Sequence, residues 1–128
     1  MITATDFKSI SRLLWTAILV GAGMAHVVVP TWFAAYYPAY LPWPDVAIFS
    51  SAIVEWLLAA LLWNRHTERA GWIGIAVLML VYTPVHIYVI THHDAIIDPP
   101  ITIPLWLAWL RLPLQFVLIG WAYRLGRR

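Results

Sequence analysis

The sequence contains no cysteine among its 128 residues and very few charged residues. The missing thiols exclude disulfide bonds, cysteine-ligated iron–sulfur clusters and covalently attached c-type haem. Only 11% of the residues are charged, 62% are hydrophobic, and the mean hydropathy is +0.77. Soluble domains do not carry this composition. The sequence therefore predicts an integral membrane protein.

Long apolar runs occupy most of the chain. A helix needs about 20 apolar residues to cross a bilayer, and none of the runs alternates as a membrane β-strand would. Their combined length leaves no room for a soluble catalytic domain, so residues 1–128 form one transmembrane domain. The predicted fold is an all-α, four-helix transmembrane bundle with spans at about residues 11–29, 45–63, 71–91 and 104–123.

Lys and Arg are absent from two of the three predicted loops. They occur before the first span, in the loop "NRHTERA" at residues 64–70, and after the fourth span. Basic loops stay in the cytoplasm, so both termini are predicted to be cytoplasmic, in a multi-pass protein of a bacterial cytoplasmic membrane. Topology thus explains the basic residues, and we expect no nucleic-acid partner.

The first outer loop is unusually rich in proline and aromatic residues. It reads "VPTWFAAYYPAYLPWPD" and remains apolar throughout. Trp and Tyr favour the membrane–water interface, so simple anchoring is the first interpretation. A lid over a lipophilic pocket is the alternative.

Four ionisable side chains lie within the predicted spans, one in each. Such residues are costly in lipid and indicate a functional site by default. Helical rise places all of them in the outer half of the bilayer, from roughly 6 to 15 Å below the outer ends of the spans. Small or polar residues share their faces, which indicates that these faces point into the bundle. The four residues are His26, Glu55, His86 and Arg111.

Glu55 and Arg111 carry opposite charges and are the expected ion pair. A pair with further hydrogen bonds offsets much of the cost of placing each charge in hydrocarbon. One interpretation is that the pair only locks the second span to the fourth. In the other, Arg111 is a fixed positive charge facing an anionic or carbonyl-bearing ligand, with Glu55 as its counter-ion or as a proton acceptor.

The two histidines leave more than one interpretation open. His26 and His86 are candidate axial ligands of a b-type haem, or of a metal site with Glu55. Hydrogen-bonded histidines inside the bundle are the simpler expectation. The "HHD" at residues 92–94 follows the third span, where histidines are more often solvated than metal-bound.

Two prolines interrupt the third and fourth spans. Pro84 and Pro113 free the carbonyls of Leu80 and Trp109 at membrane depth. These carbonyls need partners from side chains, water or a ligand.

Four segments resemble, in order and spacing, the DoxX-like family of small four-helix membrane proteins. The most specific matches are Glu55, residues 26–30 and residues 111–115. The family's third motif reads Pro-Ala-Asn-x-Tyr-Met, whereas here His86 replaces Asn and Val89 replaces Met. The segments are "GMAHVVVPTWFAAYYPAYLPWPD", "SSAIVEWLLAALLW", "TPVHIYV" and "WLRLPLQFVLIGWA".

The resemblance implies a membrane component of a redox system, since members named for function look like subunits of a thiosulfate:quinone oxidoreductase. We expect a quinone or similar lipophilic carbonyl compound to bind in an outer-leaflet pocket. Arg111 and Gln115 would donate hydrogen bonds to it, His26 and His86 would donate hydrogen bonds or relay protons, and Glu55 would balance Arg111. If the protein is an enzyme, it would be a membrane oxidoreductase or its quinone-interacting subunit, with no catalytic residue assigned.

Two other functions fit the same residues. The chain is alternatively a non-catalytic accessory subunit of a larger membrane complex, with partner subunits or further copies of itself, in which the polar cluster holds the helices together. The third hypothesis is a protein that binds haem b or a metal through His26 and His86.

Overall fold

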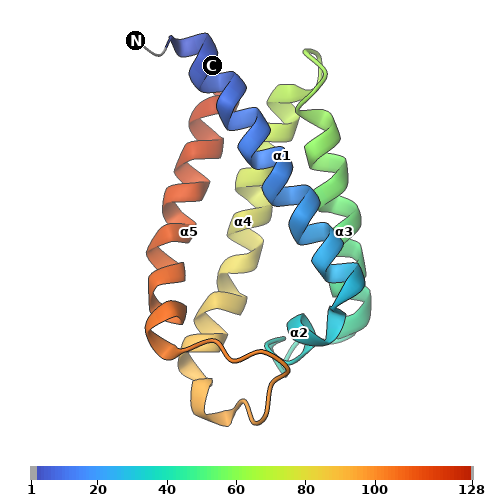
Figure 1. The fold of residues 1–128 in the computed structure, drawn as a ribbon, viewed down its shortest axis with the longest axis vertical. Coiled ribbons are helices and arrows are strands. Elements are labelled where there is room, and N and C mark those ends of the chain that lie inside the picture. The colour runs from blue at the N-terminus through green and yellow to red at the C-terminus, as the bar shows by residue number, and fades with distance from the viewer. Residues whose placement is uncertain (1–2, 128) are drawn as a thin grey trace.

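The computed structural model describes residues 3–127, and four long helices dominate it (Figure 1). Each is long and apolar enough to cross a membrane. The predicted all-α, four-helix bundle is therefore confirmed. The long helices are α1 (Ala4–Val28), α3 (Pro44–Leu61), α4 (Glu68–Thr91) and α5 (Leu105–Gly126), and the short ones are α2 (Pro30–Ala34) and the 3-10 helix η1 (His93–Ala95).

Helix α1 begins well before the predicted start at residue 11, because a capping box closes its polar first turn. The Asp6 amide donates to Thr3 Oγ1 at 3.1 Å, and the Thr3 amide donates to the Asp6 carboxylate at 3.0 Å. These bonds satisfy amides that a helix N-terminus leaves free. The hydrophobic run marks only the apolar part of this helix.

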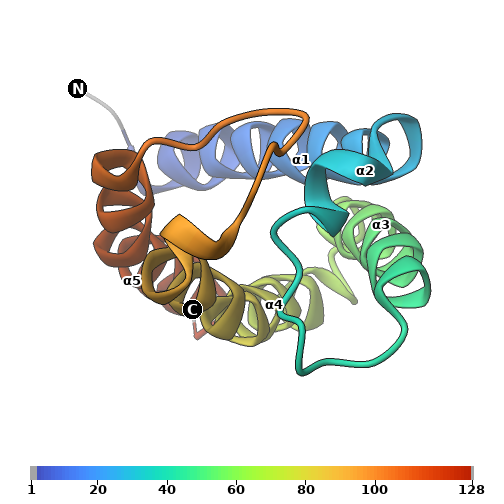
Figure 2. The same cartoon turned by 90° about the horizontal axis from the view of Figure 1, so that it is seen from below.

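The helices are arranged so that α4 lies between α3 and α5 (Figure 2). α4 packs against α5 and α3, and α1 packs against α3. The main hydrophobic core fills the half of the bundle nearer the termini. Its fully buried residues include Trp15, Leu19, Leu62, Trp72, Ile75 and Ala122.

Polar contacts join three helices at the end where both termini lie. Glu68 accepts hydrogen bonds from Lys8 Nζ and from Arg12 Nη2, both at 2.7 Å. Trp121 Nε1 donates to Ser11 Oγ at 3.1 Å. These contacts confirm that the basic N-terminal turn, the 64–70 loop and the end of α5 lie at one end of the bundle.

At the opposite end, hydrogen bonds of Tyr36 connect the two long loops. Its hydroxyl donates to the Ile101 carbonyl at 2.6 Å and accepts from the Ile103 amide at 2.9 Å. His93 Nε2 lies 2.9 Å from the Ile103 carbonyl, whereas His92 is exposed. Tyr36 is buried, so the aromatic loop covers this end of the bundle in addition to presenting exposed aromatic residues.

A close approach of α1 to α3 gives a first testable prediction. A Cβ added at Gly23 would lie 2.8 Å from Trp56 Cδ1, whereas one added at Gly21 would meet nothing within 4 Å. Gly23→Ala should therefore destabilise the protein by about 1–3 kcal/mol, the usual cost of overpacking. Gly21→Ala should be neutral or slightly stabilising, by up to about 1 kcal/mol. Reversible unfolding in mixed micelles measures both, and equal stability of the two variants would contradict the predicted packing.

Candidate functional site

The carboxylate of Glu55 joins three helices. Glu55 lies on α3 and is only 2% exposed. One carboxylate oxygen lies 3.0 Å from His26 Nδ1 on α1, and the other accepts a hydrogen bond from the Tyr82 hydroxyl on α4 at 2.9 Å. Buried carboxylates are tolerated when hydrogen-bonded in this way. The carboxylate therefore has partners from two neighbouring helices.

His26 is held from two sides. It occupies the last turn of α1 and is 8% exposed. The chain turns at Val29, and α2 starts at Pro30, which suits the first position of a helix. This turn brings the Phe33 ring over the imidazole, with the ring centroids 3.9 Å apart. α2 thus covers the histidine that contacts Glu55.

The predicted ion pair between Glu55 and Arg111 is wrong. Arg111 makes no ion pair and no side-chain hydrogen bond within residues 3–127. The physical reason is helix order: Arg111 lies on α5, and α4 separates α5 from α3 (Figure 2). Glu55 instead contacts groups on α1 and α4, which pack directly against its own helix.

Arg111 on α5 and His86 on α4 are both half-buried. His86 Nδ1 is buried and has no hydrogen-bond partner in the described part of the chain. A buried polar atom without a partner carries a desolvation cost. Within residues 3–127, the positive charge of Arg111 has no ion pair and Nδ1 of His86 has no hydrogen-bond partner.

The side-chain amide of Gln115 forms a hydrogen bond within the protein. It is 4% exposed, and its Nε2 donates to the Met79 carbonyl on α4. Thr83 Oγ1 donates to the same carbonyl at 3.2 Å. This contact joins α5 to α4, and the donation from Gln115 to a ligand stays a prediction. Arg111 lies one helical turn away on the same face of α5, so this contact also orients Arg111.

The prolines leave α4 and α5 continuous. Pro84 and Pro113 both lie inside these helices. Pro84 deprives the Leu80 carbonyl of its amide partner, and the sequence predicted a replacement from side chains, water or a ligand. The side-chain donors instead reach the carbonyl of Met79, one residue earlier.

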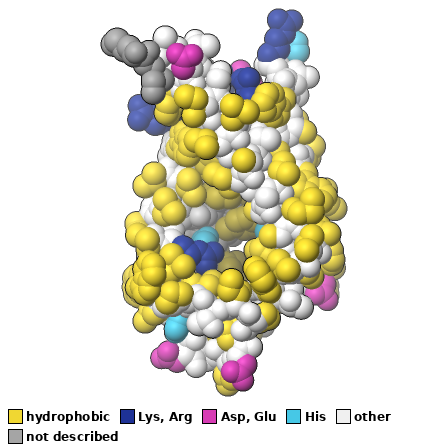
Figure 3. Space-filling view, in the orientation of Figure 1, with side chains coloured by type: hydrophobic (Ala, Val, Ile, Leu, Met, Phe, Trp, Pro, Cys, Tyr) yellow, Lys and Arg dark blue, Asp and Glu magenta, His cyan; other side chains and the backbone are white. Residues whose placement is uncertain are grey.

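One face of the bundle is hollowed between α1 and α5 (Figure 3). A Lys or Arg side chain and histidine side chains, coloured dark blue and cyan, lie beside this hollow. Arg111 is the single Lys or Arg between Arg69 and Arg124 in the sequence. Arg111 is half-buried, and the Gln115 contact fixes this part of α5 against α4.

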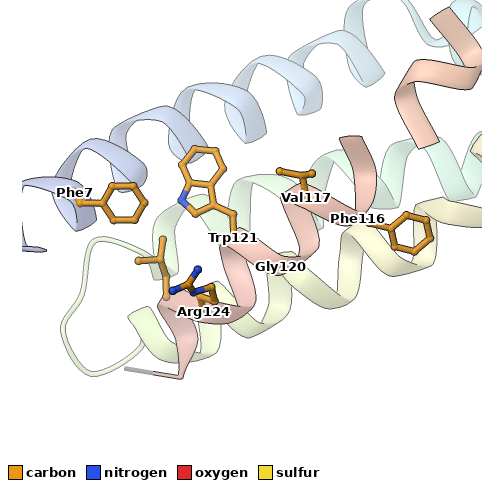
Figure 4. Close-up of a pocket in the computed structure, with 7 residues that line it drawn as sticks. Phe7, Phe116, Val117, Gly120, Trp121 and Arg124 are labelled. Atoms are coloured by element: carbon orange, nitrogen blue, oxygen red, sulfur yellow. The ribbon is translucent and has the colours of Figure 1, made fainter. Parts of the chain in front are cut away.

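Two pockets lie at other places on the molecule than this hollow. One, of about 340 Å³, lies beside Pro84 and is lined by Tyr40, Tyr88 and His92 among others. The other, of about 430 Å³, runs between α1 and α5 at the end of the bundle that holds the termini (Figure 4). None of the five predicted site residues lines either cavity.

The histidines do not belong to a larger cluster of metal-binding side chains. No group of three or more His, Asp or Glu side chains arranged to hold a metal occurs within residues 3–127. His26 directs Nδ1 to Glu55. Haem or metal binding through His26 and His86 alone stays a hypothesis from the sequence.

Comparison with known families covers nearly the whole chain. The sequence model described as "Domain of unknown function (DUF8561)" matches residues 15–126. The chain belongs to the DUF8561 family. Comparison of this DUF8561 member with curated proteins and with solved structures gave no significant match. The family description assigns no activity, so the DoxX-like resemblance stays a prediction from motifs. All five predicted site residues lie within the DUF8561 match.

Three residues of the site were missed from the sequence. Tyr82 shares a helical face with His86, four residues away, and that spacing was the available signal. Phe33 and Tyr36 lie in the aromatic outer loop. No local pattern separates them from the exposed aromatic residues around them. The partners of Tyr36 are distant in the sequence, and Phe33 reaches His26 only because the chain turns at Val29.

Proposed function

We propose that this DUF8561 protein is a DoxX-like membrane component of a redox system and that it binds a quinone or similar lipophilic carbonyl compound. Arg111 carries the proposal, because its guanidinium has no ion pair or side-chain hydrogen bond within residues 3–127. An arginine in the membrane-spanning part of a protein is costly without a partner. A ligand oxygen would supply that partner.

The chemistry of a quinone fits the two free groups. Its carbonyl oxygens accept hydrogen bonds, and the reduced ring carries more negative charge on those oxygens. The Arg111 guanidinium and the buried Nδ1 of His86, on the neighbouring helices α5 and α4, are the two groups that would serve such an oxygen. A fixed positive charge favours the reduced form. In this proposal the electrons come from a partner redox protein, and this chain holds the quinone.

The remaining polar residues support the site. Glu55, His26 and Tyr82 hold α1, α3 and α4 together, and Gln115 holds α5 on α4. Within residues 3–127, the Lys and Arg residues other than Arg111 lie near the start of α1, at the turn between α3 and α4, and near the end of α5, which is the end of the bundle with the termini. In our proposal this end faces the cytoplasm of a bacterium, which places the Arg111 site in the outer half of the membrane.

Direct binding tests the proposal. The purified protein, reconstituted in nanodiscs, is titrated with a short-chain ubiquinone while tryptophan fluorescence is recorded. The matched control ligand is the dimethyl ether of the corresponding quinol, which keeps the ring and tail but loses the carbonyl groups. We expect saturable quinone binding and at least about tenfold weaker binding of the control, since hydrogen bonds to charged groups contribute about 1.5–3 kcal/mol. Equal affinities, or no saturable binding, would overturn the proposal.

A non-catalytic accessory role has one observation in its favour. The Glu55 carboxylate has hydrogen-bond partners on α1 and α4 and does not require a ligand. In this alternative the protein contributes packing surface to a larger complex. The quinone titration distinguishes the two functions, because an accessory subunit has no reason to discriminate between the two ligands.

A further inference from the structure

A groove runs between α1 and α5 at the end of the bundle that holds the termini. Figure 4 shows Phe7 on α1 facing Trp121 and Arg124 on α5 across it. The groove has a volume of about 430 Å³. Apart from Arg124, the side chains that line it are apolar, and they are Phe7, Phe116, Val117, Trp121 and Leu125.

Gly120 keeps the middle of the groove open. It lies on α5 and lines the groove, and a Cβ placed on it would meet no other atom within 4 Å. The missing side chain leaves the concave surface between Val117 and Trp121 unfilled. Glycine lowers helix stability relative to alanine by roughly 1 kcal/mol at such a position. Because a Cβ would meet no other atom, nothing in the packing of the bundle requires a glycine here.

Arg124 supplies a positive charge at one end of this groove. The nearby Lys8 and Arg12 are both engaged by Glu68. Arg127 lies over the ring of Tyr123, with its guanidinium carbon 5.5 Å from the ring centroid. Arg124 is exposed and forms no ion pair within residues 3–127. Its charge is therefore available to an anion from outside the chain.

We propose that the groove binds one anionic phospholipid from the leaflet on the side of the termini. One acyl chain would lie along Val117, Gly120 and Trp121, and the phosphate would pair with Arg124. An apolar groove that ends in a free cation matches an amphiphile with an anionic headgroup. A zwitterionic lipid fits the groove equally well but gains less from Arg124. This site lies at the opposite end of the bundle from Arg111 and does not depend on quinone binding.

Native mass spectrometry of the full-length protein in detergent tests the proposal. Phosphatidylglycerol and phosphatidylcholine with identical acyl chains are added in equal amounts. We expect one phosphatidylglycerol per chain to be retained preferentially. Arg124→Gln should lower its retention about fivefold, in line with one basic residue acting on an anionic lipid surface. Gly120→Leu should remove the bound lipid by filling the groove.

Two variants control for fold and for total charge. Gly21→Leu adds the same side chain at another open position, on α1, and should retain the lipid. Arg127→Gln removes the same charge as Arg124→Gln and should have the smaller effect. Equal retention of the two lipids, full retention by Gly120→Leu, or equal losses in the two arginine variants would overturn the proposal. A dimer that Gly120→Leu dissociates would also overturn it, because the occupant would then be a second copy of the chain.

Discussion

Replacement of Glu55 by alanine should lower the free energy of unfolding by about 3–5 kcal/mol, the usual cost of breaking a buried hydrogen-bonded pair. The change removes the acceptor from His26 Nδ1 and from the Tyr82 hydroxyl, which lie on different helices. The buried His26 and the half-buried Tyr82 would both lose this partner. Glu55→Gln should cost less, because the amide keeps one acceptor oxygen. Reversible unfolding in mixed micelles provides the measurement.

Double-mutant cycles identify the partners of Glu55. Tyr82→Phe combined with Glu55→Gln should show a coupling energy of about 0.5–3 kcal/mol, as expected for residues in contact. Arg111→Met combined with Glu55→Gln should be additive within about 0.5 kcal/mol. A coupling of Glu55 to Arg111 as large as its coupling to Tyr82 would show that the carboxylate pairs with the arginine after all.

Replacement of Arg111 by methionine should remove quinone binding without destabilising the protein. The guanidinium makes no ion pair with a carboxylate of residues 3–127, so its loss leaves no buried charge behind. Truncating one partner of a buried charged contact costs about 2–5 kcal/mol, which corresponds to at least about 30-fold weaker binding. Arg111→Lys should show an intermediate loss, because it keeps the charge but not the planar donor fork.

A distant cation serves as the control for Arg111. Arg65 lies in the exposed loop between α3 and α4, and Arg65→Gln removes one positive charge without touching the site. Its quinone affinity should equal that of the unmodified protein in the same tryptophan-quenching titration. Unchanged affinity in Arg111→Met would remove the observation on which the proposed function depends.

The sequence predicted the helices well because lipid imposes a simple length and polarity rule on each of them. Three of the four spans agree with α3, α4 and α5 to within a few residues. The start of α1 was missed because Thr3 and Asp6 are polar and help the helix through capping, not through burial. Hydropathy carries no information about such a cap.

The partner of Glu55 could not be predicted in the same way. Opposite charge favours Arg111 over any neutral partner when helix order is unknown. The structure places α4 between the two residues and brings neutral Tyr82 to the carboxylate instead. Which helices are neighbours depends on packing across the whole bundle, and the residues around Glu55 do not encode it locally.

The contact between Tyr36 and the 101–103 segment also affects how a ligand would reach the site. Tyr36 closes the bundle at the end away from the termini, while the hollow between α1 and α5 opens on the side of the bundle. A quinone would then enter by lateral diffusion within the bilayer and never cross water. Its occupancy would follow its mole fraction among the lipids, and a long isoprenoid tail would remain outside the protein. Headgroup chemistry, and not tail length, would decide which compounds bind.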